Sequence, residues 1–182
     1  MWSAQKSMIK KNDRILYSGG LGTMGYAIPA AIGASFAAPD QRIVAICGDG
    51  GFQMSLPELQ TIMEFKIPLK IIVINNEMLG LMKNFQDENF GSLYVATVID
   101  YSVPNITKLA DVYGLKSRTL FSEKDVYETV AWFNNEKGPL LLEVKIARAW
   151  APYPKVLPGS SLTNQHPPLS AEIKEAVREI LR

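Results

Sequence analysis

Two apolar runs that end in polar motifs constrain the fold of this chain more than any other feature of its sequence. Residues 43–47 are followed directly by Gly48-Asp49-Gly50, and residues 71–74 are followed by the pair Asn75-Asn76. Neither run alternates with polar residues, which is typical of strands that are covered on both faces of a parallel sheet. Because an open α/β sheet binds ligands at the carboxyl ends of its strands, the two motifs predict one shared site there.

Strands and helices alternate along the rest of the chain. This order predicts an α/β fold with an open, mostly parallel sheet and helices on both faces. The expected elements are a short strand at 15–17, a small apolar helix at 28–38, a helix with Leu56, Leu59, Ile62 and Met63 on one stripe, a helix at 121–135 with Val126, Val130 and Phe133 turned inward, and a last strand at 140–144.

Composition excludes several classes of protein. The net charge of +1 offers no basic surface for nucleic acid, and the single cysteine, Cys47, excludes an internal disulfide and fits a reducing compartment. The longest apolar stretch, residues 27–38, is broken by Pro29 and Gly33 and is too short to cross a bilayer. We see no signal peptide. We therefore expect a soluble, cytoplasmic protein that binds neither nucleic acid nor membrane.

The end of the chain differs in character from the rest. Residues 147–168 hold five of the eleven prolines and show no periodicity, which predicts an extended arm, and Ser170 then begins a short helix. We divide the chain into a ligand-binding domain, 1–146, and a C-terminal arm with its helix, 147–182. An arm of this kind either wraps a neighbouring surface or covers an active site.

The chemistry of the two motifs is that of hard oxygen ligands. Gly50 and Gly51 offer unhindered N–H groups to an anion where the chain turns after the strand. The Asp49 carboxylate and the Asn76 amide oxygen, completed by phosphate oxygens and water, suit Mg²⁺. One histidine and one cysteine do not make a zinc site. The alternative is that both motifs are only turn sequences.

A second glycine-rich loop supports a rival interpretation. Residues 20–25 match the pattern G-x-G-x-x-G between an expected strand and a helix, and Asp49 lies where a dinucleotide-binding domain places its ribose-binding acid. The chain could then be a NAD-dependent oxidoreductase of the Rossmann type. That interpretation does not explain why the acid lies between glycines, or why Asn75-Asn76 follows the next strand.

Three segments together resemble a known family. Residues 18–33, Gly48-Asp49-Gly50 and residues 75–80 closely resemble thiamine diphosphate-dependent enzymes, and the nearest branch is the acetolactate synthase (acetohydroxyacid synthase) large subunit. The resemblance covers 1–146 and implies the diphosphate-binding domain, usually the last of three, in a sheet of about six strands. It also implies decarboxylation of a 2-keto acid such as pyruvate and transfer of the hydroxyethyl carbanion to a second keto acid, in branched-chain amino acid biosynthesis.

The resemblance assigns a role to each matching residue. Asp49, Asn76 and the main-chain oxygen of Met78 would hold Mg²⁺, and the Gly50 and Gly51 amides would bind the diphosphate. Met24 would bend the cofactor, and the Gly22 carbonyl would accept a hydrogen bond from its 4′-amino group. The other implied cofactor contacts are Thr23, Gly48, Leu79 and Gly80, and the implied substrate-facing residues are Leu81, Met82 and Phe85. The sequence pattern alone would place Met24 and the stripe formed by Met78, Leu81, Met82 and Phe85 in the core.

The family also needs parts that this sequence does not contain. The glutamate that starts the chemistry belongs to a separate pyrimidine-binding domain, and FAD, where the branch uses it, binds a middle domain and not this one. We expect a fragment of a homo-oligomeric enzyme, inactive in isolation; a natural split subunit is the other option. Phe85 stands where the branch commonly has tryptophan, so a decarboxylase, a pyruvate oxidase, an acetyltransferase and a non-catalytic binding module stay open.

Overall fold

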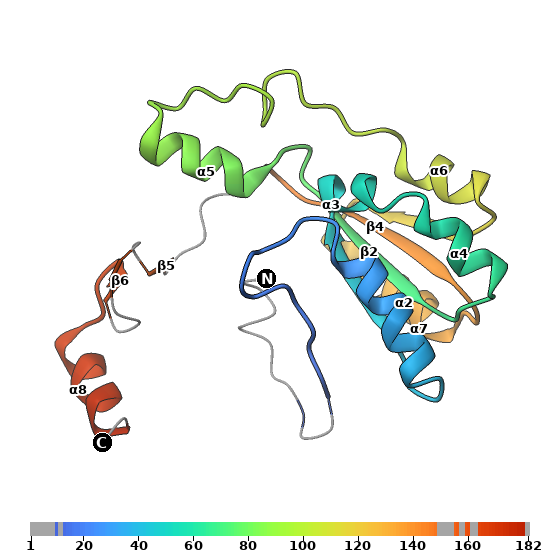
Figure 1. Ribbon diagram of the computed structural model, residues 1–182, viewed down its shortest axis with the longest axis horizontal. Helices are drawn as coiled ribbons and strands as arrows, with labels where there is room; N and C mark the ends of the chain where they lie inside the picture. Colours follow the sequence, from blue (N-terminus) through green and yellow to red (C-terminus); the bar gives the residue numbers. More distant parts are fainter. Residues whose placement is uncertain (1–9, 11–12, 149–154, 157–158, 161–163, 181–182) are drawn as a thin grey trace.

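The centre of the fold is a parallel sheet of four strands. The computed structural model describes residues 10, 13–148, 155–156, 159–160 and 164–180. The strand order is β1-β2-β4-β3, and every neighbouring pair is parallel (Figure 1). This confirms the predicted fold class, although the sheet has four strands in the described residues and not the expected six or so. The strands are β1 (Val44–Gly48), β2 (Lys70–Asn75), β3 (Lys116–Leu120) and β4 (Leu140–Lys145).

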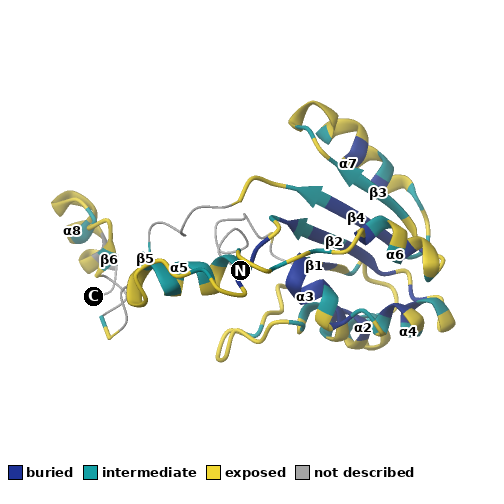
Figure 2. Cartoon of the chain, turned by 90° about the horizontal axis from the view of Figure 1, so that it is seen from above, coloured by how far each residue is buried: buried dark blue, intermediate teal, exposed yellow. Residues whose placement is uncertain are grey.

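Helices lie on both faces of this sheet, as predicted. Within the first 148 residues the described helices are α2 (Ala27–Ala37), α3 (Asp49–Met54), α4 (Glu58–Glu64), α5 (Gly80–Asn89), α6 (Ile106–Val112), the 3₁₀ turn η1 (Glu123–Asp125) and α7 (Val126–Asn135). One face is packed by α2, α3, α4 and α6, and the other by α7 (Figure 2). The helix α5 extends away from the sheet and buries none of its residues (Figure 1).

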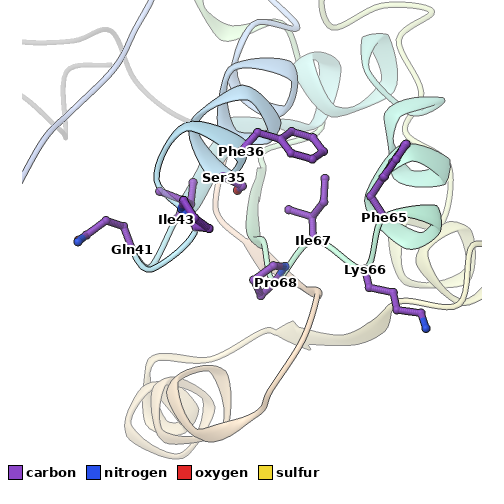
Figure 3. A pocket seen from close by; sticks show the side chains of 9 residues that line it. Ser35, Phe36, Gln41, Ile43, Phe65, Lys66, Ile67 and Pro68 are labelled. Atoms are coloured by element: carbon purple, nitrogen blue, oxygen red, sulfur yellow. The ribbon is translucent and has the colours of Figure 1, made fainter.

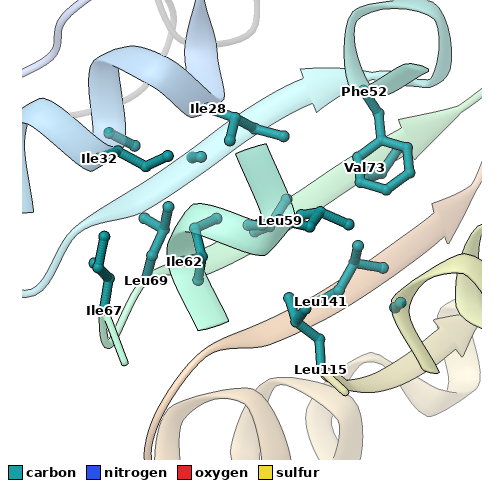
Figure 4. Close-up of a cluster of buried hydrophobic side chains, with 14 of the residues drawn as sticks. Ile28, Ile32, Phe52, Leu59, Ile62, Ile67, Leu69, Val73, Leu115 and Leu141 are labelled. Carbon is teal, nitrogen blue, oxygen red and sulfur yellow. The ribbon is translucent and has the colours of Figure 1, made fainter. Parts of the chain in front are cut away.

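The main core lies between the sheet and the larger group of helices. Side chains from alternate positions of the strands point into it because successive residues of a strand face opposite sides. Figure 4 shows these side chains meeting those of α2, α3 and α4. The fully buried members include Phe52, Leu59, Ile62, Leu69, Ile71, Val73 and Leu141.

The helix α7 packs in a phase that differs from the prediction. Phe133 is buried against Leu140 and Leu142 of β4, as expected. Val130, however, is 46% exposed, so its predicted inward position is wrong. Thr129 is buried in its place, one helical turn before Phe133. The burial of the aromatic ring sets the phase of the helix, and Thr129 fits on the same stripe.

The predicted strand at 15–17 is also wrong. These residues have no strand structure, and the side chains of Ile15, Leu16 and Tyr17 are exposed. In the described part of the chain, β1 pairs only with β2, so its outer edge has no neighbouring strand. Val44 and Ile46 of β1 point to the face on which α7 packs, but they are 40% and 60% exposed, because α7 packs over Leu140 and Leu142 of β4 and does not cover β1.

The described part of the C-terminal arm has a little regular structure. The strands β5 (Lys155–Val156) and β6 (Gln165–His166) form an antiparallel pair, and α8 (Ala171–Ile180) follows. The Ser170 hydroxyl accepts a hydrogen bond of 3.3 Å from the Ile173 N–H, so the predicted helix start at Ser170 is confirmed. An ion pair joins Lys155 to Glu88 of α5. None of the described helices has the length and apolar character needed to cross a membrane.

Candidate functional site

The two polar motifs meet at the carboxyl edge of the sheet, as the sequence predicts. Asp49 opens α3 directly after β1, and Asn76 follows the last residue of β2. These strands are neighbours, and Gly48 pairs with Ile74 in the parallel register. The two strand ends therefore place the motifs side by side.

Asp49 is buried, and one of its carboxylate oxygens has no hydrogen-bond partner in the described part of the chain. Its side chain is 2% exposed, and Oδ1 accepts a hydrogen bond of 3.0 Å from the Gly50 N–H. Oδ2 is inaccessible and has no hydrogen-bond partner among the described residues. Burial raises the pKa of this carboxyl, and backbone N–H groups at Gly50 and Glu77 oppose that rise. A buried carboxylate oxygen without a partner is costly, and a bound cation would satisfy it.

The two asparagines, which the sequence presents as one motif, have different surroundings. The Asn75 Nδ2 donates to Oε1 of Glu143 at 2.6 Å, and its Oδ1 accepts from the Glu77 N–H at 3.1 Å. Asn75 is 1% exposed, so it belongs to the framework of the site. Asn76 is half-buried, and its Oδ1 accepts only a long bond of 3.4 Å from the Met78 N–H. Its amide oxygen therefore has capacity for another partner.

The glycine-rich loop at residues 20–25 is attached to the end of α3. The Ser55 hydroxyl donates to the Gly25 carbonyl at 2.6 Å, and the Thr23 N–H donates to the Ser18 hydroxyl at 3.1 Å. Met24 is 47% exposed, so it is not a core residue, and its sulfur lies 3.5 Å from the position of a Cβ built on Gly50. The structure thus brings Met24 to the start of α3, beside the Asp49 motif.

Gly50 lies in a cradle that a side chain would fill. A Cβ at this position would come within 2.7 Å of Leu79 Cδ2 and 3.2 Å of the Tyr101 hydroxyl oxygen. Only hydrogen leaves room there for a ligand to approach the backbone. Gly51 is also buried, and a Cβ on it would lie 3.6 Å from the Gly25 nitrogen. The orphaned carboxylate oxygen and this cradle fit a divalent cation with a phosphate group.

Tyr101 is a site residue that sequence reasoning missed. Its hydroxyl is buried and, within the described residues, has no hydrogen-bond partner. Burial, followed by the charge of Asp49, raises the pKa of this phenol to about 12. Tyr101 lies in the segment between α5 and α6, outside every recognisable motif. No sequence signal pointed to it, because only the fold brings that segment to Gly50.

The predicted substrate-facing residues lie on α5 and do not reach the core. Leu81, Met82 and Phe85 are 54%, 51% and 52% exposed. The Phe85 ring contacts that of Phe90 edge-on, at 5.7 Å between centroids. The helix begins close to the site, since the Leu79 N–H donates to the Thr97 carbonyl at 2.9 Å and Asn76 Nδ2 lies 3.3 Å from a Cβ built on Gly80. The exposed stripe is therefore free for contact with a ligand or partner.

A hollow of about 180 Å³ lies at the opposite edge of the sheet. It is lined by residues that precede β1 and β2, including Ile43, Ile67 and Pro68 (Figure 3). Phe36 and Phe65 flank it with their rings edge-on at 5.9 Å. None of the predicted site residues lines it. This hollow is thus separate from the chemistry at the carboxyl edge.

The structure offers little support for a dinucleotide site. The loop 20–25 should follow a strand in that fold, yet residues 13–19, which directly precede it, form none. Within the described residues, no three His, Cys, Asp or Glu side chains gather as a metal-ligand cluster. Any metal at this site would rely on amide, main-chain and phosphate oxygens beside Asp49.

The comparison with known proteins decides between these two families. The family model for the C-terminal TPP-binding domain of thiamine pyrophosphate enzymes matches residues 1–144. The chain belongs to this family. Thiamine pyrophosphate is another name for thiamine diphosphate, so the resemblance noted in the sequence is confirmed.

Relatives of this thiamine pyrophosphate enzyme domain include acetolactate synthases. The large subunit from Porphyra purpurea is 38% identical over 161 residues, which are 88% of this chain and 27% of that protein. The probable large subunit from Methanocaldococcus jannaschii is 40% identical over 176 residues, 96% of this chain and 29% of that protein. The chain thus spans between a quarter and a third of their length.

A solved structure shows the same fold. The thiamine diphosphate-dependent 4-hydroxybenzoylformate decarboxylase of Rhodococcus jostii RHA1 is similar over 70% of this chain and 24% of its own, with a TM-score of 0.60 and 28% identity. The relatives thus include both acetolactate synthases and a decarboxylase.

Proposed function

We propose that this chain is the diphosphate- and Mg²⁺-binding domain of a thiamine diphosphate-dependent enzyme of the acetolactate synthase type. The observation that carries the proposal is the unpartnered Oδ2 of buried Asp49 beside the open cradle at Gly50. A cation held by this oxygen would satisfy the first feature, and a phosphate group of the ligand would occupy the second.

Three oxygen atoms of the chain would hold the metal. They are a carboxylate oxygen of Asp49, the amide oxygen of Asn76 and the main-chain oxygen of Met78. The capacity left on Asn76 Oδ1 supports its part in this set. The N–H groups of Gly50 and Gly51 would bind the diphosphate, with Gly48 and Gly80 leaving room for its approach.

The thiamine end of the cofactor would lie against the glycine-rich loop at residues 20–25. Met24 would support the bent cofactor, and the Gly22 carbonyl would accept from its 4′-amino group, with Thr23 and Leu79 in contact. The Ser55 bond to Gly25 supports this role, because it holds the loop against α3. When bound, the cofactor supplies the ring that stabilises a carbanion after decarboxylation.

The substrate of the whole enzyme would be a 2-keto acid, and acetolactate formation is our first choice. The named relatives favour it, since the acetolactate synthases are 38% and 40% identical to this chain. A decarboxylase is the second candidate, because the solved structure is one. Leu81, Met82 and Phe85 would face the substrate and decide the choice of acceptor. FAD, if the full enzyme uses it, would bind elsewhere than in this domain.

The domain would work only with partners. A pyrimidine-binding domain, in the same full-length chain or in another subunit, would supply the catalytic glutamate within a homo-oligomer. The exposed apolar stripe of α5 supports such a contact. We further propose that 1–146 is the cofactor-binding unit, that 147–182 is its arm, and that the isolated chain does not turn over substrate.

Calorimetric titration of thiamine diphosphate tests the proposal. We expect binding with Mg²⁺, and none with EDTA or after Asp49→Ala in the presence of Mg²⁺. Binding of NAD with no response to thiamine diphosphate would overturn the proposal.

A further inference from the structure

The segment that joins α5 to α6 is fixed in place by many hydrogen bonds. The Gln86 side chain donates to the Val95 carbonyl at 3.2 Å and accepts from the Thr97 hydroxyl at 2.5 Å. The Tyr94 hydroxyl donates to Asp87. In Figure 1 this segment runs back from α5 towards the sheet, where α6 begins. Tyr101 therefore sits on an ordered segment.

Most polar groups of this segment have partners, but the Tyr101 hydroxyl does not. It is inaccessible and, among the described residues, makes no hydrogen bond of normal geometry. Its oxygen lies 3.2 Å from the Cβ position of Gly50, so it faces the cradle. A buried hydroxyl without a partner costs the folded protein free energy, which a bound acceptor would recover.

We propose that the Tyr101 hydroxyl is a further ligand-binding group of this site and donates a hydrogen bond to an oxygen of the diphosphate. This inference rests on the proposed function. The side chains of Asp49 and Gln53 lie beside this phenol, and Oδ2 of Asp49 is also buried without a partner. With a cation on Asp49, a phosphate oxygen in the cradle at Gly50 would offer the phenol a charged acceptor, which the neutral Gln53 amide does not.

The role is one of binding and not of chemistry. The cradle at Gly50 is formed by Leu79, Met24 and Tyr101, and of these only tyrosine carries a hydrogen-bond donor. Tyr101 would therefore recognise the diphosphate itself, whatever organic group it carries. Inorganic pyrophosphate with Mg²⁺ is accordingly a sufficient probe.

The test compares Tyr101→Phe with the wild type and with Tyr94→Phe, all as the 182-residue chain. Each is titrated with thiamine diphosphate and, separately, with inorganic pyrophosphate, both with Mg²⁺. We expect Tyr101→Phe to weaken both affinities about tenfold, the effect of one hydrogen bond to a charged group. Tyr94→Phe removes a phenol of the same segment that bonds to Asp87, and it should bind both as the wild type does.

Thermal unfolding of the ligand-free chain gives a second, independent result. Because the hydroxyl is buried without a partner, Tyr101→Phe should melt at the same temperature as the wild type or higher. A lower melting temperature, unchanged affinities, or an equal loss in Tyr94→Phe would overturn the inference. If the wild type bound neither probe, the proposed function itself would fail, whereas equal binding by wild type and Tyr101→Phe would remove only this inference.

Discussion

Asn75 donates a hydrogen bond of 2.6 Å from its side-chain nitrogen to Oε1 of Glu143, which joins the carboxyl end of β2 to the neighbouring strand β4. Glu143 is 5% exposed, and its other oxygen accepts from the Thr119 hydroxyl at 3.0 Å. Three neighbouring strands, β2, β4 and β3, are thus connected at their carboxyl ends. The turn that carries Asn76 starts from this anchored point.

The two asparagines should therefore respond differently to alanine. Asn75→Ala removes the amide donor from the buried Oε1 of Glu143, which keeps only its ion pair with Lys145 at 3.3 Å, so we expect a loss of about 1–2 kcal/mol in the free energy of unfolding. Asn76→Ala should stay within about 0.5 kcal/mol of the wild type but lose Mg²⁺-dependent binding of thiamine diphosphate. Urea unfolding and calorimetric titration measure the two effects. The reverse pattern would contradict these assignments.

Asp49→Asn should separate stability from binding. Burial raises the pKa of Asp49 above its ordinary value of 3.8, so the folded chain holds this proton more tightly than the unfolded chain. In the metal-free wild type, the contribution of Asp49 to the free energy of unfolding therefore falls as the pH rises from 3.8 through the raised pKa. The variant lacks that penalty and should unfold at a higher temperature at neutral pH.

The same variant should bind cofactor far more weakly. It removes a metal ligand, so we expect more than the roughly 10–100-fold loss that follows from changes in residues around a metal's ligands. Thermal unfolding at several pH values and titration with Mg²⁺ and thiamine diphosphate measure both effects. A variant that bound as the wild type does would exclude Asp49 as a ligand.

Gly50→Ala should cost binding without costing much stability. The added methyl group would press on the free ends of the Leu79 and Tyr101 side chains, which can shift, and alanine favours a helix over glycine by about 1 kcal/mol. We expect a free energy of unfolding within about 1 kcal/mol of the wild type and loss of pyrophosphate binding. Gly138→Ala, at a positive φ with open space around it, is a control that should bind normally.

We expect Lys70 to contribute to the stability of the fold and not to cofactor binding. Its buried ammonium donates to the carbonyls of Phe133, Asn134 and Glu136 at the end of α7. Lys70→Met would leave these acceptors without that donor and should destabilise the fold by about 2 kcal/mol, with cofactor affinity unchanged. Lys116→Met, which removes an exposed ion pair with Glu136, should cost less than about 1 kcal/mol. Urea unfolding of both variants checks the contrast.

The thiol of Cys47 should react slowly. Burial, followed by the charge of Asp49, raises its pKa to about 12, so very little thiolate exists at neutral pH. We expect iodoacetamide to modify the native chain much more slowly than the urea-unfolded chain. Equal rates, measured by mass spectrometry, would show that Cys47 is accessible and ionised.

The sequence predicts most of the sheet because three of its strands are almost wholly apolar. The apolar runs of β2 and β4 are buried inside the fold, as their composition predicts. The run of residues 43–47 also forms a strand, but its predicted cover on both faces is wrong, because Val44 and Ile46 are exposed. The strand β3 was missed because Lys116, Ser117 and Arg118 give it a polar character, which an edge strand tolerates. The short helix α3 was missed because Asp49-Gly50-Gly51 has a low helix propensity.

The sequence likewise predicts some parts of the candidate site and not others. Asp49, Asn76 and the glycines were predicted because they follow buried strands, and parallel strands bring their carboxyl ends to one edge. The different surroundings of Asn75 and Asn76 could not be predicted, because the partner of Asn75 lies on β4. Tyr101 likewise depends on a contact between distant segments, which local pattern does not encode.

The outer edge of β1 has a consequence for handling the protein. Its backbone groups have no partner strand in the described part of the chain, and Val44 and Ile46 beside them are exposed. Such an edge invites another strand to pair with it. Concentrated solutions should therefore contain assemblies whose size grows with concentration, and Ile46→Lys should shift sedimentation profiles towards the single chain.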